Sequence, residues 1–307
     1  MMVVYTIRRI MYLVPVLLGV VFLISVSLEF IPGDPAALIL GQFATPEAVS
    51  AMREDLHLNQ PFFVRYLYYI RGLLRADLGR SFTLRREVSA EIAEALPATL
   101  ELTGVSMMIV LLVSIPLGTV TAAKPNSTLD NVVRVLSLGG LSMPVFWTGI
   151  LLMLLFGLHL RWFPVCGYGG IRYLVLPAVT LAAPSVGMMT RIVRSSIMEV
   201  LHEDYINTAR AKGLTESLVL YKHALRNGLI PVITLLGTQL GQMLGGAVLT
   251  ESVFAWPGLG RLTIYAIFSR DFILIQGVVL VFALLYAITN LLVDISYTIV
   301  NPAIVYD

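Results

Sequence analysis

Lysine and histidine could support phosphate or metal chemistry in this 307-residue chain, so their surroundings come first. A P-loop needs a lysine directly after glycine and before serine or threonine, because that lysine must reach the phosphates of a nucleotide. None of the three lysines follows glycine; they are Lys124, Lys212 and Lys222. The sequence therefore predicts that this chain holds no nucleotide in a P-loop.

The histidines and the single cysteine also argue against a metal or catalytic centre. No two histidines stand three or four residues apart, the spacing that puts two ligands on one helix face; they are His57, His159, His202 and His223. Cys166 stands alone, which excludes an internal disulfide and a multi-cysteine metal site. The chain also lacks the Gly-x-Ser-x-Gly and His-Glu-x-x-His patterns of hydrolases and metalloproteases. We therefore expect no catalytic residue and no bound metal.

Composition then indicates the broad class of protein. Hydrophobic residues make up 57% of the chain and charged residues only 13%, with a mean hydropathy of +0.84. Soluble domains carry about a quarter charged residues. The net charge of +2 is too small to indicate nucleic acid as a partner. These values predict an integral membrane protein whose surroundings are the lipid bilayer.

Charge-free stretches locate the membrane spans, because a charged side chain inside a bilayer is costly. Six windows reach about 18 residues, the length that a spanning helix needs; they are 10–28, 102–123, 135–160, 173–190, 227–250 and 272–293. The sequence therefore predicts an all-α fold with six transmembrane helices. No cleavage site follows the first window, so we interpret residues 1–30 as an uncleaved anchor span.

Basic residues in short loops set the orientation, since they concentrate on the cytoplasmic side. With a cytoplasmic N-terminus, ten basic residues lie in the inner segments and four in the short outer loops, Arg161, Arg172, Arg261 and Arg270. Segment 31–98 is left out of this count because long translocated loops largely escape the rule. We therefore expect both termini in the cytoplasm.

Segment 31–98 between the first two spans is predicted to be helical and extracytoplasmic. Thr45 before Pro46 is typical of a helix start. Residues 61–75 mix aromatics and arginines at helical spacing, as in a helix at the membrane interface. A third helix is expected from Arg85 to Leu96, ending before Pro97. The segment could be a cap over the outer ends of the spans or a docking platform for a partner; composition alone favours the cap.

Segment 191–226 is the largest cytoplasmic loop. Asp204 is expected to cap a short helix over 205–212, which ends at Gly213 in a left-handed conformation. Thr215 can then start a second helix that runs to about Arg226. Alanines around the turn would let another surface approach, and Arg210 and Lys212 would offer it charge. An ordinary basic inner loop is the alternative, and charge alone favours it.

The spans offer small and mildly polar residues but no charged site. Gly237, Gly241 and Gly245 repeat every four residues in the fifth window, a stripe where helices can pack closely. Four other residues are candidates for a translocation path: Ser142, Met143, Gln239 and Gln242. Without carboxylates or histidines in the spans, a tight site for a bare divalent cation is not expected. Weakly polar side chains along the spans would suit a cargo that is not held tightly.

Several motifs make the chain resemble the peptide/nickel class of ABC importer permeases along nearly its whole length. Asn207-Thr208-Ala209 stands where that family has Glu-Ala-Ala in its cytoplasmic loop, with Gly213 and the later Pro231 behind it. Both the replaced acid and the distant proline are usual in the peptide branch. The other similar stretches are Ile31–Pro35, Leu58–Pro61, Asp77–Gly79, Leu96–Leu100, Phe254–Arg261 and Asn301-Pro302.

This resemblance implies a subunit with partners. A second permease would pair with the chain, two ATPases would bind ATP and Mg²⁺ below it, and an extracytoplasmic binding protein would dock on segment 31–98. The coupling residues towards an ATPase would be Asp204, Tyr205, Thr208, Ala209, Arg210, Ala211, Lys212 and Gly213.

The same resemblance implies an organisation and a place in the cell. Segment 31–98 would follow the anchor, 99–300 would form a five-helix core that includes 191–226, and 301–307 would be a tail. The chain would lie in the cytoplasmic membrane of a bacterium or archaeon and import di- or oligopeptides. Nickel, a nickel chelate or glutathione are alternative cargoes, and a stand-alone channel or secondary transporter is the alternative class.

Overall fold

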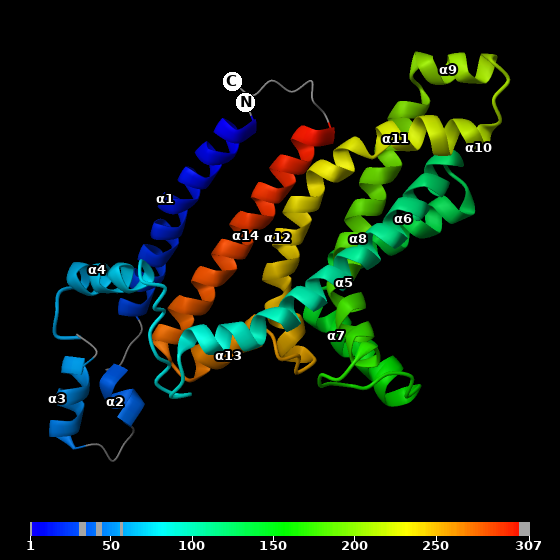
Figure 1. The fold of residues 1–307 in the computed structure, drawn as a ribbon. Coiled ribbons are helices and arrows are strands. Elements are labelled where there is room, and N and C mark those ends of the chain that lie inside the picture. Colours follow the sequence, from blue (N-terminus) through cyan, green and yellow to red (C-terminus); the bar gives the residue numbers. More distant parts are fainter. Residues whose placement is uncertain (1, 31–34, 41–44, 56–57, 301–307) are drawn as a thin grey trace. The chain divides into compact units, whose positions relative to one another are not determined.

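The computed structural model of the chain describes residues 2–30, 35–40, 45–55 and 58–300, and this part is helical (Figure 1). Within it, the only β-pairing is an isolated bridge between Arg80 and Glu87. The helices are α1 Met2–Glu29, α2 Pro35–Leu40, α3 Pro46–Asp55, α4 Phe62–Leu73, α5 Val88–Ala123, α6 Thr128–Ser142, α7 Val145–Leu152, the π-helix η1 Met153–His159, α8 Ile171–Leu201, α9 Asp204–Ala211, α10 Glu216–Leu218, the π-helix η2 Val219–Ala224, α11 Leu225–Gly228, α12 Ile230–Val253, α13 Leu259–Phe268 and α14 Phe272–Val300.

The helices form two compact units. One unit comprises Met1–Pro97 and Gly258–Ala287, and the other comprises Ala98–Pro257 and Ile288–Asp307. The helices α5 and α14 each contribute to both. The all-α prediction is confirmed for the described residues.

In the first unit, α4 packs on α1 through aromatic side chains. The ring of Phe22 on α1 meets the rings of Phe62 and Tyr66 on α4 edge-on, with centroids 5.7 and 5.6 Å away. The Tyr66 hydroxyl also donates a hydrogen bond to the Leu18 carbonyl at 3.0 Å. The helix expected over 61–75 is thus confirmed as α4.

A buried carboxylate ties the loop before α5 to the start of α14 in the same unit. Asp271 is fully buried and accepts hydrogen bonds from the hydroxyls of Ser81, at 2.6 Å, and Thr83, at 2.8 Å. Its second oxygen accepts from the backbone N–H of Leu274 at 3.1 Å, which caps α14. The carboxylate therefore has donors on both oxygens and remains hydrogen-bonded although it is buried.

The helix start predicted at Thr45 is confirmed, and the helix end predicted before Pro97 is wrong. The Thr45 hydroxyl accepts from the N–H of Ala48 at 3.3 Å at the start of α3. The third helix begins at Val88 and continues through Pro97 to Ala123. A proline removes one hydrogen bond from a helix, and packing on both sides of it can offset that loss. Ala95 and Ala98, on either side of Pro97, are both buried.

Helix α8 is the centre of the second unit. A Cβ added at Gly118 of α5 would lie 2.6 Å from the side chain of Val193, and one at Gly140 of α6 would lie 3.2 Å from the Ala183 carbonyl oxygen. On another side, Gly246 of α12 approaches Leu181 of α8. Glycines therefore allow three helices to pack closely on α8, where larger residues would hold them apart.

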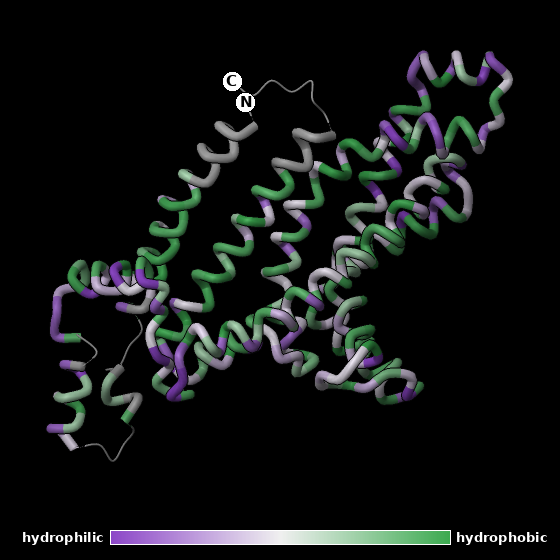
Figure 2. Tube along the Cα trace, viewed as in Figure 1, coloured by the Kyte–Doolittle hydropathy of each residue, from purple (hydrophilic) through white to green (hydrophobic). Residues whose placement is uncertain are grey.

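Four of the six predicted windows form helices long and apolar enough to cross a membrane: Val88–Ala123, Ile171–Leu201, Ile230–Val253 and Phe272–Val293. Window 10–28 lies in α1, whose described apolar part, Met11–Ser27, is shorter. Figure 2 shows the hydrophobic residues along these helices and hydrophilic residues gathered in the loop of α9 and α10.

The third window is not the single helix that we predicted. Thr128–Ser142 and Val145–His159 meet at an angle of 110°, so they form one broken span or a re-entrant pair. Met143 is extended, with φ −88° and ψ 131°, because the ring of Pro144 disfavours helical backbone at the preceding residue. The structure therefore contains four candidate spans, or five with the bent pair, in its described part.

Candidate functional site

The predicted cytoplasmic loop folds as a helix, a sharp turn and a second helix. Helix α9 ends at Ala211, and Gly213 has φ +80°, so the left-handed turn is confirmed. The cap assigned to Asp204 is wrong, because Asp204 is the first helical residue and Glu203 stands at the cap position without a side-chain bond. The helical hydrogen bonding begins one residue earlier than predicted, because the N–H groups of Ile206 and Asn207 donate to the Glu203 carbonyl at 3.0 and 3.3 Å.

Two polar contacts and a small core hold α9 against the second helix. The side-chain amide of Asn227 donates to the Tyr205 hydroxyl at 2.7 Å, and Arg210 Nε donates to Glu216 at 2.8 Å across the turn. Ile206 and Ala209 are buried in the core of the second unit. The loop is therefore a packed element, and its geometry is set by contacts within the chain.

The residues predicted to contact a partner lie mostly on the outer face of this element. Seven of the eight are exposed: Asp204, Tyr205, Thr208, Arg210, Ala211, Lys212 and Gly213. Ala209 is the exception, because its methyl group faces the core. A protruding face of small and charged residues is suited to contact with another protein chain.

The polar residues predicted along the spans lie in different surroundings. Gln239 on α12 is buried, and its side-chain amide donates to the Met188 sulfur at 3.1 Å. Gln242 is exposed. Ser142 and Met143 are exposed at the break between α6 and α7. The structure does not gather these four into one site.

The glycines of the predicted stripe also lie in different surroundings. A Cβ at Gly237 would lie 2.7 Å from the side chain of Val293 on α14, whereas one at Gly245 would meet nothing within 4 Å. Gly241 is buried. Close helix contact is therefore present at one end of the stripe and absent at the other.

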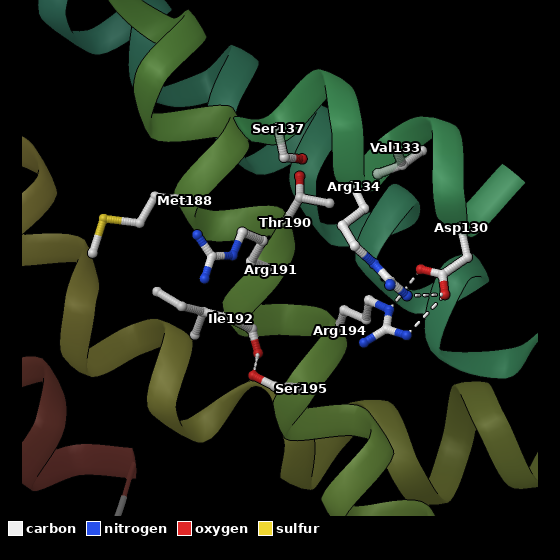
Figure 3. Close-up of a pocket in the computed structure, with 10 residues that line it drawn as sticks. All are labelled: Asp130, Val133, Arg134, Ser137, Met188, Thr190, Arg191, Ile192, Arg194 and Ser195. Carbon is white, nitrogen blue, oxygen red and sulfur yellow. Dashed lines mark hydrogen bonds and ion pairs between the residues drawn. The ribbon is translucent and has the colours of Figure 1, made fainter. Parts of the chain in front are cut away.

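A cavity of about 420 Å³ lies between α6 and α8 (Figure 3). Its lining residues are Asp130, Val133, Arg134, Ser137, Met188, Thr190, Arg191, Ile192, Arg194 and Ser195. The Asp130 carboxylate is fully buried and takes two hydrogen bonds from Arg194, at 2.7 and 2.8 Å, and one from Arg134 at 3.0 Å. In the described part of the chain, no three histidine, cysteine or acidic side chains gather as a metal site would require.

Two family models match the chain, and together they cover almost all of it. The family model described as "Binding-protein-dependent transport system inner membrane component" matches residues 114–306, and its N-terminal companion matches residues 2–103. The chain belongs to this family. It is the permease subunit of an ABC importer, and the predicted resemblance is confirmed.

Named relatives cover almost the whole permease. The glutathione transport system permease protein GsiC of Salmonella choleraesuis is 42% identical over 302 residues, which is 98% of this chain and 99% of that protein. The dipeptide transport system permease protein DppB of Alkalihalophilus pseudofirmus is 38% identical, over 99% of this chain and 100% of that protein. A putative peptide transport system permease protein of Brucella melitensis is 42% identical over the full length of both.

A solved structure shares the fold. A chain of the MetNI methionine ABC transporter in an inward-facing conformation aligns with a TM-score of 0.58 at 17% identity, over 68% of the permease and 96% of that chain. The shared part is thus about two thirds of the permease.

Sequence reasoning missed a buried polar cluster at the end of α12. The Glu251 carboxylate is fully buried and accepts from the Thr99 hydroxyl at 2.7 Å, and Trp256 Nε1 donates to the Ala98 carbonyl at 2.8 Å. The ring of Tyr168 meets Trp256 edge-on at 4.7 Å. The available signal is an acid, Glu251, directly after the fifth apolar window.

Proposed function

We propose that the permease imports di- or oligopeptides by alternating access, with α9 as the helix that receives motion from an ATPase subunit. The proposal rests on α9, which is a short exposed helix. Its position is held by the Tyr205–Asn227 and Arg210–Glu216 contacts. A force applied to such an element is passed to α8 and α12 through the packed core that contains Ile206.

The proposed complex contains a second permease, two ATPases that bind ATP and Mg²⁺, and an extracytoplasmic binding protein. The permease carries no P-loop, so ATP hydrolysis belongs to the partners. The helices α2, α3 and α4 would then face the binding protein. In this proposal α1 and the bent α6–α7 pair complete six spans in the cytoplasmic membrane, with the N-terminus inside.

The cargo is proposed from chemistry and from the relatives. Relatives are named as dipeptide, peptide and glutathione permeases, and glutathione is itself a tripeptide. Affinity would belong to the binding protein, because the six apolar windows contain no charged residue that could anchor a peptide terminus. Titration of the cognate binding protein with dipeptides, longer peptides, glutathione and Ni²⁺ chelates identifies the cargo. Tight binding of a non-peptide alone would contradict the peptide assignment.

The coupling role is tested at Gly213. A Cβ at this position meets nothing within 4 Å, so a substitution acts through backbone conformation alone. We expect Gly213→Val to disfavour the positive φ by about 1 kcal/mol or more and to reduce peptide uptake and cargo-stimulated ATP hydrolysis in reconstituted vesicles. Gly213→Asn is the matched control, because asparagine tolerates this conformation. Full uptake by Gly213→Val at normal membrane levels would refute the assignment.

A further inference from the structure

The cavity between α6 and α8 contains polar groups that have no partner among the described residues. Arg134 and Arg194 bind Asp130, but Arg191 has no ion-pair or hydrogen-bond partner in the described part of the chain. Thr190 is only 2% exposed, and its buried hydroxyl has no hydrogen-bond partner in the described part of the chain. Three arginines against one aspartate leave the lining with a net charge of +2. The cavity therefore offers charge and a hydrogen-bond donor to an anion.

The position of these arginines along the chain places the cavity at a membrane surface. Arg134 directly precedes the apolar window 135–160, and Arg191 directly follows the window 173–190. Both residues thus mark the edge of an apolar window, which in a membrane span is the depth of the lipid headgroups. Basic pockets between spans at this depth are suited to anionic lipid headgroups.

The surroundings of the cavity are apolar on the membrane side. Val133, Met188 and Ile192 form part of its wall. Val135 and Leu136 lie on α6 between the lining residues Arg134 and Ser137, and they are 68% and 69% exposed. A free inorganic anion would make no favourable contact with these apolar side chains, whereas the acyl chains attached to a headgroup would cover them.

We propose that this cavity binds an anionic phospholipid, with its phosphate held beside Arg191 and Thr190 and its acyl chains along the exposed face of α6. Arg191 supplies the attraction, since Arg194 and Arg134 are engaged by Asp130. Thr190 supplies a hydroxyl donor whose burial is otherwise uncompensated. The site is separate from α9 and does not depend on the identity of the cargo.

Lipid retention by the purified full-length permease, with the subunits that copurify with it, tests the proposal. The probes are dioleoylphosphatidylglycerol and zwitterionic dioleoylphosphatidylcholine, added in detergent and followed by native mass spectrometry. We expect preferential retention of phosphatidylglycerol and about fivefold weaker retention by Arg191→Gln, the value of one arginine at an anionic surface. Arg172→Gln, at the other end of α8, is the matched control and should retain lipid like the unchanged chain.

Two further measurements keep the outcome clear. Thr190→Val, which keeps the shape of the side chain, should also weaken phosphatidylglycerol retention. Equal retention by Arg191→Gln and Arg172→Gln would overturn the proposal, as would equal retention of the two lipids by the unchanged chain. Displacement of the lipid by millimolar inorganic phosphate would show a free-anion site instead, and would also overturn it.

Discussion

Gly187 on α8 and Ser137 on α6 are in backbone contact: a Cβ on Gly187 would lie 2.6 Å from the carbonyl oxygen of Ser137 and 3.2 Å from its Cα. Backbone atoms cannot move aside as a flexible side chain can. This contact therefore sets the distance between α6 and α8, and with it the width of the cavity that Ser137 and the neighbouring Met188 help to line.

Gly187→Ala should accordingly destabilise the permease, by about 1–3 kcal/mol, the usual cost of overpacking a close contact. Thermal unfolding of the purified protein in detergent measures the effect. Gly245→Ala is the matched control, because it is also in the interior of a helix and its Cβ meets nothing within 4 Å. Similar unfolding temperatures for the two variants would contradict the contact.

The two arginines on Asp130 should differ in their tolerance of lysine. Arg194 binds both carboxylate oxygens, and its side chain is 22% exposed; Arg134 makes one bond and is 46% exposed. Lysine cannot reproduce a two-pronged contact. We expect Arg194→Lys to cost about 1.5 kcal/mol or more in the free energy of unfolding, and Arg134→Lys no more than about 1 kcal/mol. A larger loss in Arg134→Lys would reverse the assignment.

The two glutamines of α12 should separate stability from transport. Gln239→Ala removes a buried side chain that binds Met188, so it should lower thermal stability as well as uptake. Gln242 is exposed, and Gln242→Ala should leave stability unchanged while altering the uptake rate if its side chain faces the cargo. Neither change should alter the cargo affinity of the binding protein. Normal uptake by Gln242→Ala would remove this residue from the path.

Orientation can be tested with the chain's single cysteine. Cys166 is exposed and lies in the loop between the third and fourth windows, which the basic-residue count places outside the cytoplasm. A membrane-impermeant maleimide should therefore label intact spheroplasts, and Cys166→Ser should abolish the labelling. Labelling that appears only after the membrane is permeabilised would mean that the orientation is inverted.

Local rules predicted the elements whose causes are local. The left-handed turn at Gly213 and the cap at Thr45 depend on one residue and its neighbours, and both were found. Local rules were wrong where packing intervened. Pro97 does not end its helix, and the 135–160 window bends at Pro144, although it contains enough apolar residues for one span. The length of a charge-free window reports how apolar a segment is, whereas the bend in this segment depends on the backbone at Pro144.

The predicted site residues show the same division. Eight residues of the coupling loop were chosen from motif resemblance, and the structure places seven of them on an exposed face. The glycines were chosen by their regular spacing, but the closest backbone contact is at Gly187, which belongs to no repeat. The sequence does not single out Asp130 or Glu251, because their burial depends on partners distant in sequence, Arg194 and Thr99.

The sequence by itself determined the class of this protein. Apolar composition, charge-free windows and the motif around Gly213 identify a permease, since each is a property of consecutive residues. Only the tertiary structure decided which residues meet across helices: Gly187 with Ser137, Arg194 with Asp130, and Gln239 with Met188. The physical reason is that helix hydropathy is a sum over a segment, whereas a contact between helices depends on the rotation and spacing of two segments far apart in the chain.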